Sequence, residues 1–243
     1  MEKSDFYLGT HLVHWSWTVD VPLFISRRRL QRYKTYKPAL NKWALDSGGF
    51  TELSMFGKWT IGAEQYADEV RRQMERGKMQ WCAPQDWMCE PFIVEKTGLS
   101  VDLHIGKTVE NYCELKALNL PVIPVLQGWK IKDYEICVER YGQHGVDLTA
   151  AETVGLGSVC RRQASDEIGQ IAQMVHNYGI KAHGFGVKAQ GIQRYGKYLK
   201  SADSLSWSFT GRYLKQTKCG RQSCANCLHF ALEWRDQVLS TIK

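Results

Sequence analysis

The sequence lacks the features that would place a chain in a membrane or outside the cell. No stretch approaches the roughly 18 consecutive apolar residues that a membrane-spanning helix needs. Three of the first five residues are charged and no apolar stretch follows them, so no signal peptide is predicted. We therefore expect a cytoplasmic protein without a membrane partner.

Internal repeats, low-complexity tracts and linker-like segments are also lacking, which favours a single domain over residues 1–243. Hydrophobic residues make up 44% of the chain and charged residues 23%, an ordinary balance for a globular protein with a normal core. The length of 243 residues is close to the roughly 250 of a single (β/α)₈ barrel.

The sequence has fewer acidic than basic residues. The chain has 32 Lys and Arg against 25 Asp and Glu, a net charge of +7. A polyanionic partner such as a nucleic acid would explain this excess, and a solvated basic surface is the alternative. The basic residues cluster at positions 27–29, 71–72, 161–162 and across 188–200.

Short apolar runs alternate with longer amphipathic stretches, a pattern typical of repeated βα units. It predicts strands at residues 6–10, 43–45, 81–84, 122–126, 154–156, 182–187 and 204–207. It predicts helices at residues 63–75, 101–118, 131–141, 166–178 and 225–239, with Gly77 stopping the first. We expect an α/β fold of the (β/α)₈ TIM-barrel type. Since seven strands are recognised, the eighth is hidden in the N-terminal third or the barrel is irregular.

Polar residues follow four of the apolar runs. The runs stop at Asp46-Ser47-Gly48-Gly49-Phe50, Gln85-Asp86, Gln127-Gly128 and Gly157-Ser158, about 30 to 40 residues apart. Active sites of α/β barrels lie at the carboxyl ends of the strands, so these residues are expected to converge on one face. Taken singly, each segment could instead be a turn, a helix cap or a loop.

The string Asp46-Ser47-Gly48-Gly49-Phe50 resembles the signature of the tRNA-guanine transglycosylases, in which Asp-Ser-Gly-Gly precedes an aromatic residue. Other segments resemble the family in the same chain order, spanning residues 46 to 212. They are Pro84-Gln85-Asp86, Val125-Leu126-Gln127-Gly128, Gly155-Leu156-Gly157-Ser158, His183-Gly184-Phe185-Gly186-Val187 and Asp203-Ser204-Leu205-Ser206-Trp207 with Arg212.

The chain also departs from the family. Thr51 stands where the family usually has Gln, and Cys89 lies three residues after Asp86 instead of two. The chain is shorter than a typical bacterial member. In its compact, basic form it is most similar to the phage-type branch that puts 7-deazaguanines into DNA, the DpdA proteins, which would place it in the host cytoplasm.

This resemblance implies exchange of guanine for a 7-deazaguanine, such as preQ0, through a covalent glycosyl-enzyme intermediate. Asp203 would be the nucleophile and Asp46 the general acid and base. Asp86 would read the N1-H and N2-H₂ edge of guanine, and Gln127 with the backbone N–H of Gly157 the carbonyl edge. The remaining expected contacts are with the base, from Ser47, Phe50, Phe185 and Gly186, and with nucleic acid, from Arg212.

Eight cysteines in a cytosolic chain argue against a disulfide framework. Five are scattered and are read as buried thiols. The spacing Cys219-x₄-Cys224-x₂-Cys227-x-His229 predicts a structural Zn²⁺ site within residues 218–230, with free thiols or a redox pair as the alternative. The family carries zinc on Cys₃His with a different spacing, and His229 could instead be a plain helix residue.

Three other functions remain open from the sequence. One is a nucleoside or glycoside hydrolase barrel, which would use Asp46 and Asp203 without a purine-reading pair. Another is a zinc-stabilised nucleic-acid-binding barrel without catalysis. The third is a transglycosylase acting on tRNA instead of DNA. The sequence also leaves open a homodimer and accessory modification proteins.

Overall fold

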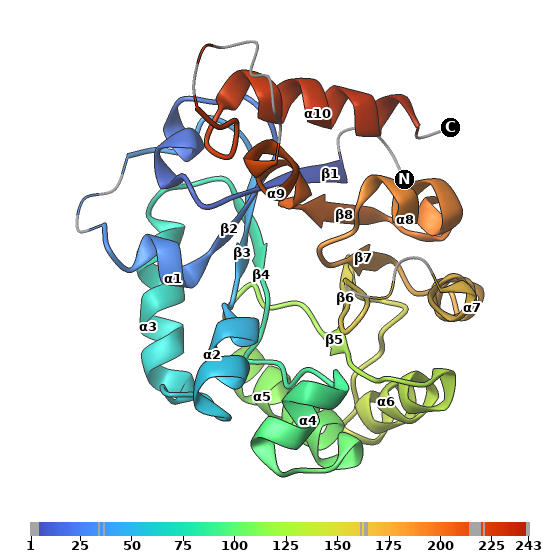
Figure 1. Cartoon of the computed structure of the whole chain (residues 1–243). Coiled ribbons are helices and arrows are strands. Elements are labelled where there is room, and N and C mark those ends of the chain that lie inside the picture. The colour runs from blue at the N-terminus through green and yellow to red at the C-terminus, as the bar shows by residue number, and fades with distance from the viewer. Residues whose placement is uncertain are drawn as a thin grey trace.

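The protein is described by a computed structural model that covers residues 5–33, 35, 37–160, 162, 165–213, 220 and 222–241. Within this part of the chain, eight strands form one curled parallel sheet (Figure 1). They are β1 (Phe6–Thr10), β2 (Leu23–Ser26), β3 (Trp43–Asp46), β4 (Met79–Cys82), β5 (Val125–Leu126), β6 (Val154–Leu156), β7 (Ala182–Gly184) and β8 (Ser201–Ser204).

The order of the strands follows the chain around the sheet, from β4 back through β1 to β8 and on to β5. The remaining gap is bridged between β4 and the segment before β5. There the N–H of Cys82 donates to the Pro121 carbonyl at 3.0 Å, and that of Ile123 donates to the Cys82 carbonyl at 3.1 Å. The architecture is that of an α/β fold with a curled sheet consistent with a TIM-type barrel.

The helices lie on the outside of this sheet (Figure 1). They are η2 (Val13–Trp17), α1 (Arg27–Leu30), α2 (Gly49–Phe56), α3 (Ala63–Met74), α4 (Pro91–Thr97), α5 (Val101–Ala117), α6 (Ile131–Gln143), α7 (Asp166–Asn177), α8 (Ala189–Tyr195), η3 (Gly196–Tyr198), α9 (Ser206–Arg212) and α10 (Leu228–Ser240). None of the described helices is long and apolar enough to span a membrane.

Helix α3 shows how the amphipathic pattern produces this layer. Tyr66, Ala67 and Val70 recur at helical spacing and are fully buried, so this face packs on the sheet. Gly77 has a φ of 67°, in the left-handed region that glycine adopts at low cost, and it ends the segment. The helix predicted over residues 63–75 is confirmed, as are the other four predicted helices within a few residues.

Two apolar clusters flank the sheet because side chains alternate along each strand. Phe6 and Leu8 of β1 belong to the large outer core under the helices. Tyr7, between them, belongs to a smaller inner cluster with Trp81, Phe24 and other residues. The inner cluster fills the centre of the barrel. It lies beneath the residues at the carboxyl ends of the strands.

Most predicted strands are confirmed, with shifted or shortened ends. The eighth strand is β2, in the N-terminal third, which was one of the two possibilities left open by the sequence. The strand predicted at residues 204–207 is wrong, because β8 ends at Ser204 and Ser206 begins α9. The Ser204 hydroxyl accepts a bond from the Ser206 N–H at 3.3 Å, which turns the chain. Trp207 then points at β1 from a helix and donates to the Gly9 carbonyl at 2.8 Å.

The surface charge also differs from the prediction. Arg27, expected in a basic surface cluster, is buried and bonded to Glu52 and Glu69, each at 2.8 Å. Cations of the other clusters form ion pairs too: Arg71 with Asp68, Arg162 with Glu167, Arg194 with Asp166 and Lys200 with Glu152. Because these cations are already paired with carboxylates, the clusters are weaker evidence for a nucleic-acid partner than the sequence alone suggests.

Candidate active site

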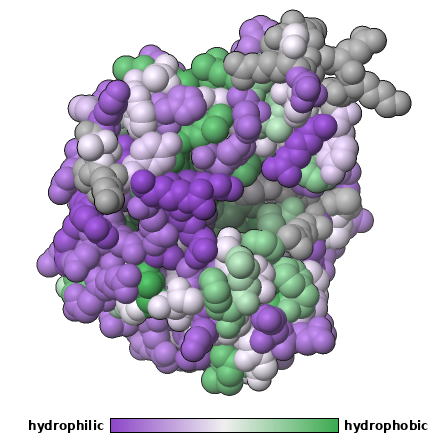
Figure 2. All heavy atoms as spheres, turned by 60° about the vertical axis from the view of Figure 1, so that its left-hand side comes forward, coloured by the Kyte–Doolittle hydropathy of each residue, from purple (hydrophilic) through white to green (hydrophobic). Residues whose placement is uncertain are grey.

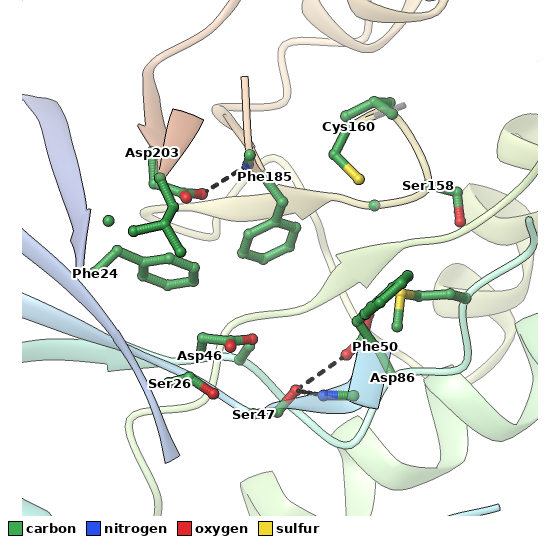
Figure 3. A pocket seen from close by; sticks show the side chains of 18 of the residues that line it. Phe24, Ser26, Asp46, Ser47, Phe50, Asp86, Ser158, Cys160, Phe185 and Asp203 are labelled. Carbon is green, nitrogen blue, oxygen red and sulfur yellow. Dashed lines mark hydrogen bonds between the residues drawn. The ribbon is translucent and has the colours of Figure 1, made fainter. Parts of the chain in front are cut away.

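A cavity of about 260 Å³ lies at the carboxyl ends of the strands (Figure 3). Its lining residues lie in the strands or in the segments that directly follow them, and all eight strands contribute. Nine residues predicted from the sequence line it together: Asp46, Ser47, Phe50, Asp86, Gln127, Gly157, Phe185, Gly186 and Asp203. Residues that are up to 157 positions apart in the chain are thus gathered at one site, as expected for a barrel.

Asp46 is the last residue of β3 and begins the Asp-Ser-Gly-Gly turn. Its Oδ1 accepts a bond from the Gly48 N–H at 3.1 Å. Gly48 has a φ of 80°, so the tight turn into α2 uses a conformation that glycine adopts readily. Burial raises the pKa of Asp46, and the nearby charge of Asp203 adds to the rise. A carboxyl group of this kind holds its proton to higher pH than an exposed aspartate does.

The turn after Asp46 is anchored by Arg27, a residue whose role the sequence did not show. The Arg27 side chain donates to the Ser47 carbonyl at 3.1 Å. Its ion pairs with Glu52 of α2 and Glu69 of α3 tie these helices to the motif. The buried charges are mutually satisfied, so Arg27 holds the carboxyl end of β3 in place.

Asp86 lies in a network of side-chain hydrogen bonds that includes Ser47 of the same turn. Its Oδ2 accepts from Gln127 Nε2 at 2.6 Å, and its Oδ1 from Ser47 Oγ at 3.3 Å. Burial raises the pKa of Asp86 to about 7 despite these bonds, and the charge of Asp46 contributes. Near neutral pH this carboxyl group is therefore divided between its protonated and ionised forms.

Gln127 is fully buried, and its amide is oriented by both neighbours. Nε2 donates to Asp86, while Oε1 faces the Ser158 hydroxyl at 2.7 Å. Ser158 has a φ of 54°, an uncommon conformation for a non-glycine residue that often marks functional sites. Its hydroxyl also lies 2.8 Å from Glu90 Oε2. Ser158 and Glu90 both line the cavity and were not assigned a role from the sequence.

Gly157 lines the cavity, but its backbone N–H is already bonded within the sheet, and its contact with a base remains a prediction. Its N–H, expected to bind a base, donates to the Leu126 carbonyl at 2.9 Å as part of the sheet. A Cβ at this position would lie 2.3 Å from Gln127 Nε2. The absence of a side chain at Gly157 thus leaves the room that the Gln127 amide occupies.

Asp203 lies within β8 and is 4% exposed. Its Oδ1 accepts from the Gly186 N–H at 2.9 Å and lies 3.3 Å from His183 Nε2. Figure 3 shows Asp203 and Asp46 both pointing into the cavity, from β8 and from β3. Two carboxyl groups that act on one reacting carbon need such an arrangement.

Three phenyl rings line the cavity, those of Phe24, Phe50 and Phe185. Phe185 stacks on Phe24, with centroids 5.9 Å apart. Phe50, on α2, is 38% exposed and meets Phe92 edge to face at 6.1 Å. The prediction that Phe50 and Phe185 sandwich a base remains a prediction. Phe24 was not recognised in the sequence, because the strand that carries it was not.

Arg212 ends α9, is exposed and does not line the cavity, so its contact with nucleic acid remains a prediction. The described residues include no group of three or more metal-ligating side chains. Cys219, one of the four predicted zinc ligands, lies outside them. Cys224 and Cys227 are buried on one turn, which suits half of a thiolate site, while His229 is largely exposed on α10, 3.7 Å from Glu233. The zinc site remains a prediction.

Figure 2 shows the face that lies to the left in Figure 1. It is mostly hydrophilic and is hollowed near its middle, where hydrophobic residues are visible. A polar surface around a partly apolar hollow is typical of a small-molecule or base-binding site.

Solved structures with some similarity include a Sinorhizobium meliloti protein provisionally described as an isomerase, in two forms, and an enolase protein from environmental sequencing of the Sargasso Sea. Identities are 10%, 11% and 8%, and TM-scores 0.42, 0.41 and 0.41. The matches cover 82% of this chain and 50%, 49% and 54% of the others, so the chain spans about half their length. This likeness is too weak to carry an argument about activity.

A comparison with curated proteins found no match. The family comparison is specific. One family model, described as DpdA, DeoxyPurine in DNA protein A, matches residues 1–243, the whole chain. The resemblance to guanine transglycosylases in the sequence and the gathering of its motif residues in one cavity agree with this match. The chain belongs to the DpdA family, which is similar to the tRNA-guanine transglycosylases.

Proposed function

We propose that this protein exchanges guanine in DNA for a 7-deazaguanine base such as preQ0, through a covalent bond between Asp203 and the sugar. One observation carries the proposal: Asp46, Asp86 and Asp203 come from separate segments and line the same cavity. Membership in the DpdA family supports DNA as the polymer and a deazapurine as the product.

The first half of the reaction removes guanine. An oxygen of the Asp203 carboxylate attacks C1′ of the nucleotide as the C1′–N9 bond breaks, and the electron pair leaves with the base. Asp46 gives its proton to the departing guanine. The raised pKa of Asp46 suits this role, because the carboxyl group must be protonated before the bond breaks.

The second half installs the new base. The ionised Asp46 takes the proton from N9 of the incoming 7-deazaguanine, N9 bonds to C1′, and the C1′–oxygen bond to Asp203 breaks. The carboxylate and the protonated Asp46 are restored. Two displacements at C1′ retain the configuration of the sugar.

Base recognition is assigned to the network around Asp86. In its ionised form, Asp86 accepts bonds from the N1–H and N2–H₂ groups of guanine, which adenine cannot supply in the same pattern. Gln127 donates one amide proton to Asp86, and we assign its second amide proton to O6 of guanine. A site whose buried polar groups are left unpaired by the wrong base rejects that base strongly.

The target nucleotide must leave the base stack to reach a cavity of this kind. Flipping a base costs a few kcal/mol, and contacts to the flanking phosphates offset that cost. We assign these contacts to cations on the surface, with Arg212 as the candidate predicted from the sequence.

A base-exchange assay tests the proposal. Radiolabelled guanine is offered with duplex DNA, single-stranded DNA and tRNA, and with 7-cyano-7-deazaguanine as a second base detected by mass spectrometry. We expect incorporation into DNA that is lost in Asp203→Ala and kept in Asp68→Asn, whose aspartate lies on the surface and is 70% exposed. Incorporation into tRNA alone would overturn the choice of polymer. Binding of DNA without exchange of either base would contradict the enzyme and favour a binding protein.

A further inference from the structure

His183 lies beneath the candidate nucleophile, and nothing in the proposed reaction uses it. It belongs to β7 and is fully buried inside the barrel. Four aromatic rings surround its imidazole with centroids between 4.8 and 5.8 Å away, those of Tyr7, Phe24, Trp81 and Phe185. A polar ring in such a cage is costly unless both nitrogens find partners.

Both nitrogens of His183 do have partners, and both partners come from β8. Nδ1 lies 2.8 Å from Ser201 Oγ, and Nε2 lies 3.3 Å from Asp203 Oδ1. Ser201 and Asp203 are two residues apart in a strand, so they face the same side. Their spacing matches the two ends of one imidazole.

The chemistry of the partners fixes the tautomer. An ionised carboxylate can only accept hydrogen bonds, so His183 Nε2 must carry the proton that it shares with Asp203. The Ser201 hydroxyl can then donate to Nδ1. Oδ1 of Asp203 thus receives two N–H groups, from His183 and from Gly186, while no bond from the described residues reaches Oδ2.

We propose that His183 is a positioning residue for Asp203: it holds Oδ1 in place so that Oδ2 faces the sugar, and it stabilises the carboxylate when that carboxylate is released. The inference rests on the proposed function. His183 does not line the cavity and transfers no proton, so it acts only through Asp203.

The two halves of the reaction should depend on His183 differently. Once Oδ2 has bonded to C1′, Oδ1 is the carbonyl oxygen of an ester. When the C1′–Oδ2 bond breaks, negative charge returns to the carboxylate, and preorganised donors stabilise such developing charge. Loss of the His183 donor should therefore slow breakdown of the intermediate more than its formation.

Three variants separate this role from packing. His183→Gln keeps an N–H₂ group near the position of Nε2, whereas His183→Asn keeps a partner for Ser201 but is too short to reach Asp203. His183→Leu removes both bonds and suits an aromatic cage, so it is expected to fold. The three variants are compared in single-turnover assays of each half-reaction.

We expect His183→Gln to stay within about 10-fold of the wild-type rates. His183→Asn and His183→Leu should slow breakdown of the intermediate by about 10²-fold. The covalent adduct then accumulates at steady state, while KM for the base changes little. Equal rates in all three variants, or equal slowing of both half-reactions by Asn and Gln alike, would overturn the proposal.

A second measurement does not need the enzyme to be active. In ¹⁵N-histidine-labelled protein, the signal of His183 is identified as the one missing from His183→Gln. We expect a proton on Nε2. A bare Nε2 would overturn the proposal, because that nitrogen would then present a lone pair to Asp203. If Nε2 is protonated but no nucleic acid yields exchange or an adduct, the proposed function fails and the contact between His183 and Asp203 stands.

Discussion

Asp203 and Asp86 lie at two ends of the cavity (Figure 3). They are similarly buried, but their hydrogen-bond partners differ. Asp203 is 4% exposed and is held by a backbone N–H and an imidazole. Asp86 is 8% exposed and is held by the amide of Gln127 and the hydroxyl of Ser47. In the proposed reaction, the first set of partners leaves Oδ2 of Asp203 available to attack the sugar. The second set builds the polar edge to which we assign recognition of the base. The proposed function thus gives the same residue type a chemical role at one end of the cavity and a recognition role at the other.

Asp46 is close enough to both Asp203 and Asp86 to interact with their charges. Its replacement is expected to have a large effect on the rate of adduct formation. Asp46→Asn cannot protonate the leaving guanine, so the rate of adduct formation should fall by about 10²–10⁴-fold. DNA affinity should change little. In the wild type the rate should decline on the alkaline side as Asp46 ionises, and the variant should lack this decline.

These outcomes are measured by single-turnover kinetics across pH and by DNA binding at fixed salt. An Asp46→Asn variant with the wild-type rate would show that another group is the acid.

Asp86→Asn tests the recognition end. The ionised form of Asp86 accepts the guanine protons, and its pKa is about 7, so wild-type affinity for guanine should weaken as pH falls below 7. The variant should bind guanine about 10²-fold more weakly at pH 8 and show no such pH dependence, since bonds to a charged acceptor contribute roughly 1.5–3 kcal/mol each. Calorimetric titration with guanine measures both effects.

The corresponding variant of Asp203 separates base binding from catalysis. Asp203→Asn should leave guanine affinity nearly unchanged while it abolishes exchange. If both variants lost guanine binding equally, the division of the cavity into two ends would be incorrect.

Gly157→Ala tests the packing behind Gln127. The new Cβ would lie 2.3 Å from Gln127 Nε2, so the amide must move away from Asp86. We expect stability to fall by about 1–3 kcal/mol and KM for the base to rise. Gly169→Ala, on α7 with open space around its Cβ, is the matched control and should stabilise slightly. Urea denaturation measures the stability of both variants. Equal changes in stability would contradict the tight packing of Gly157 against Gln127.

The smallest expected effect is on the pH dependence of stability. The pKa of Asp86 is about 7 in the folded state against an ordinary value of 3.8, so the folded protein keeps a proton that the unfolded chain releases. This stabilisation is complete below about pH 4 and is lost as pH rises through 7. Asp86→Asn should therefore gain stability over the wild type by on the order of 2 kcal/mol between pH 5 and 8.

Urea denaturation at both pH values checks this prediction, with Asp68→Asn as the control. If the free energies of unfolding of the wild type and Asp86→Asn differed by the same amount at pH 5 and at pH 8, the raised pKa of Asp86 would be contradicted.

Sequence patterns predicted the fold well where strands are apolar and bounded by turns. Strands β1 and β6 were predicted to the residue for this reason. Strand β8, Ser-Ala-Asp-Ser, has almost no apolar signal, and the alternation that follows it belongs to a helix. The prediction therefore placed this strand three residues late and left Asp203 outside it.

The cavity residues were predicted by their position after strands and by family resemblance, but their partners were not. Asp86 and Gln127 are 41 residues apart, and Arg27 and Glu69 are 42 apart. Nothing local indicates that Arg27 is buried while Arg28 is half-buried and Arg29 is exposed. His183 likewise lies in a recognised motif, yet its contact with Asp203 depends on the register between β7 and β8.

The most direct test of the account is a search for the covalent bond itself. Wild-type protein is incubated with DNA and no incoming base, denatured, digested with nuclease and protease, and mapped by mass spectrometry. We expect a deoxyribose-bearing fragment attached to the peptide that contains Asp203, absent from Asp203→Asn. An attachment to another residue, or guanine release and exchange with no attachment at all, would contradict this expectation.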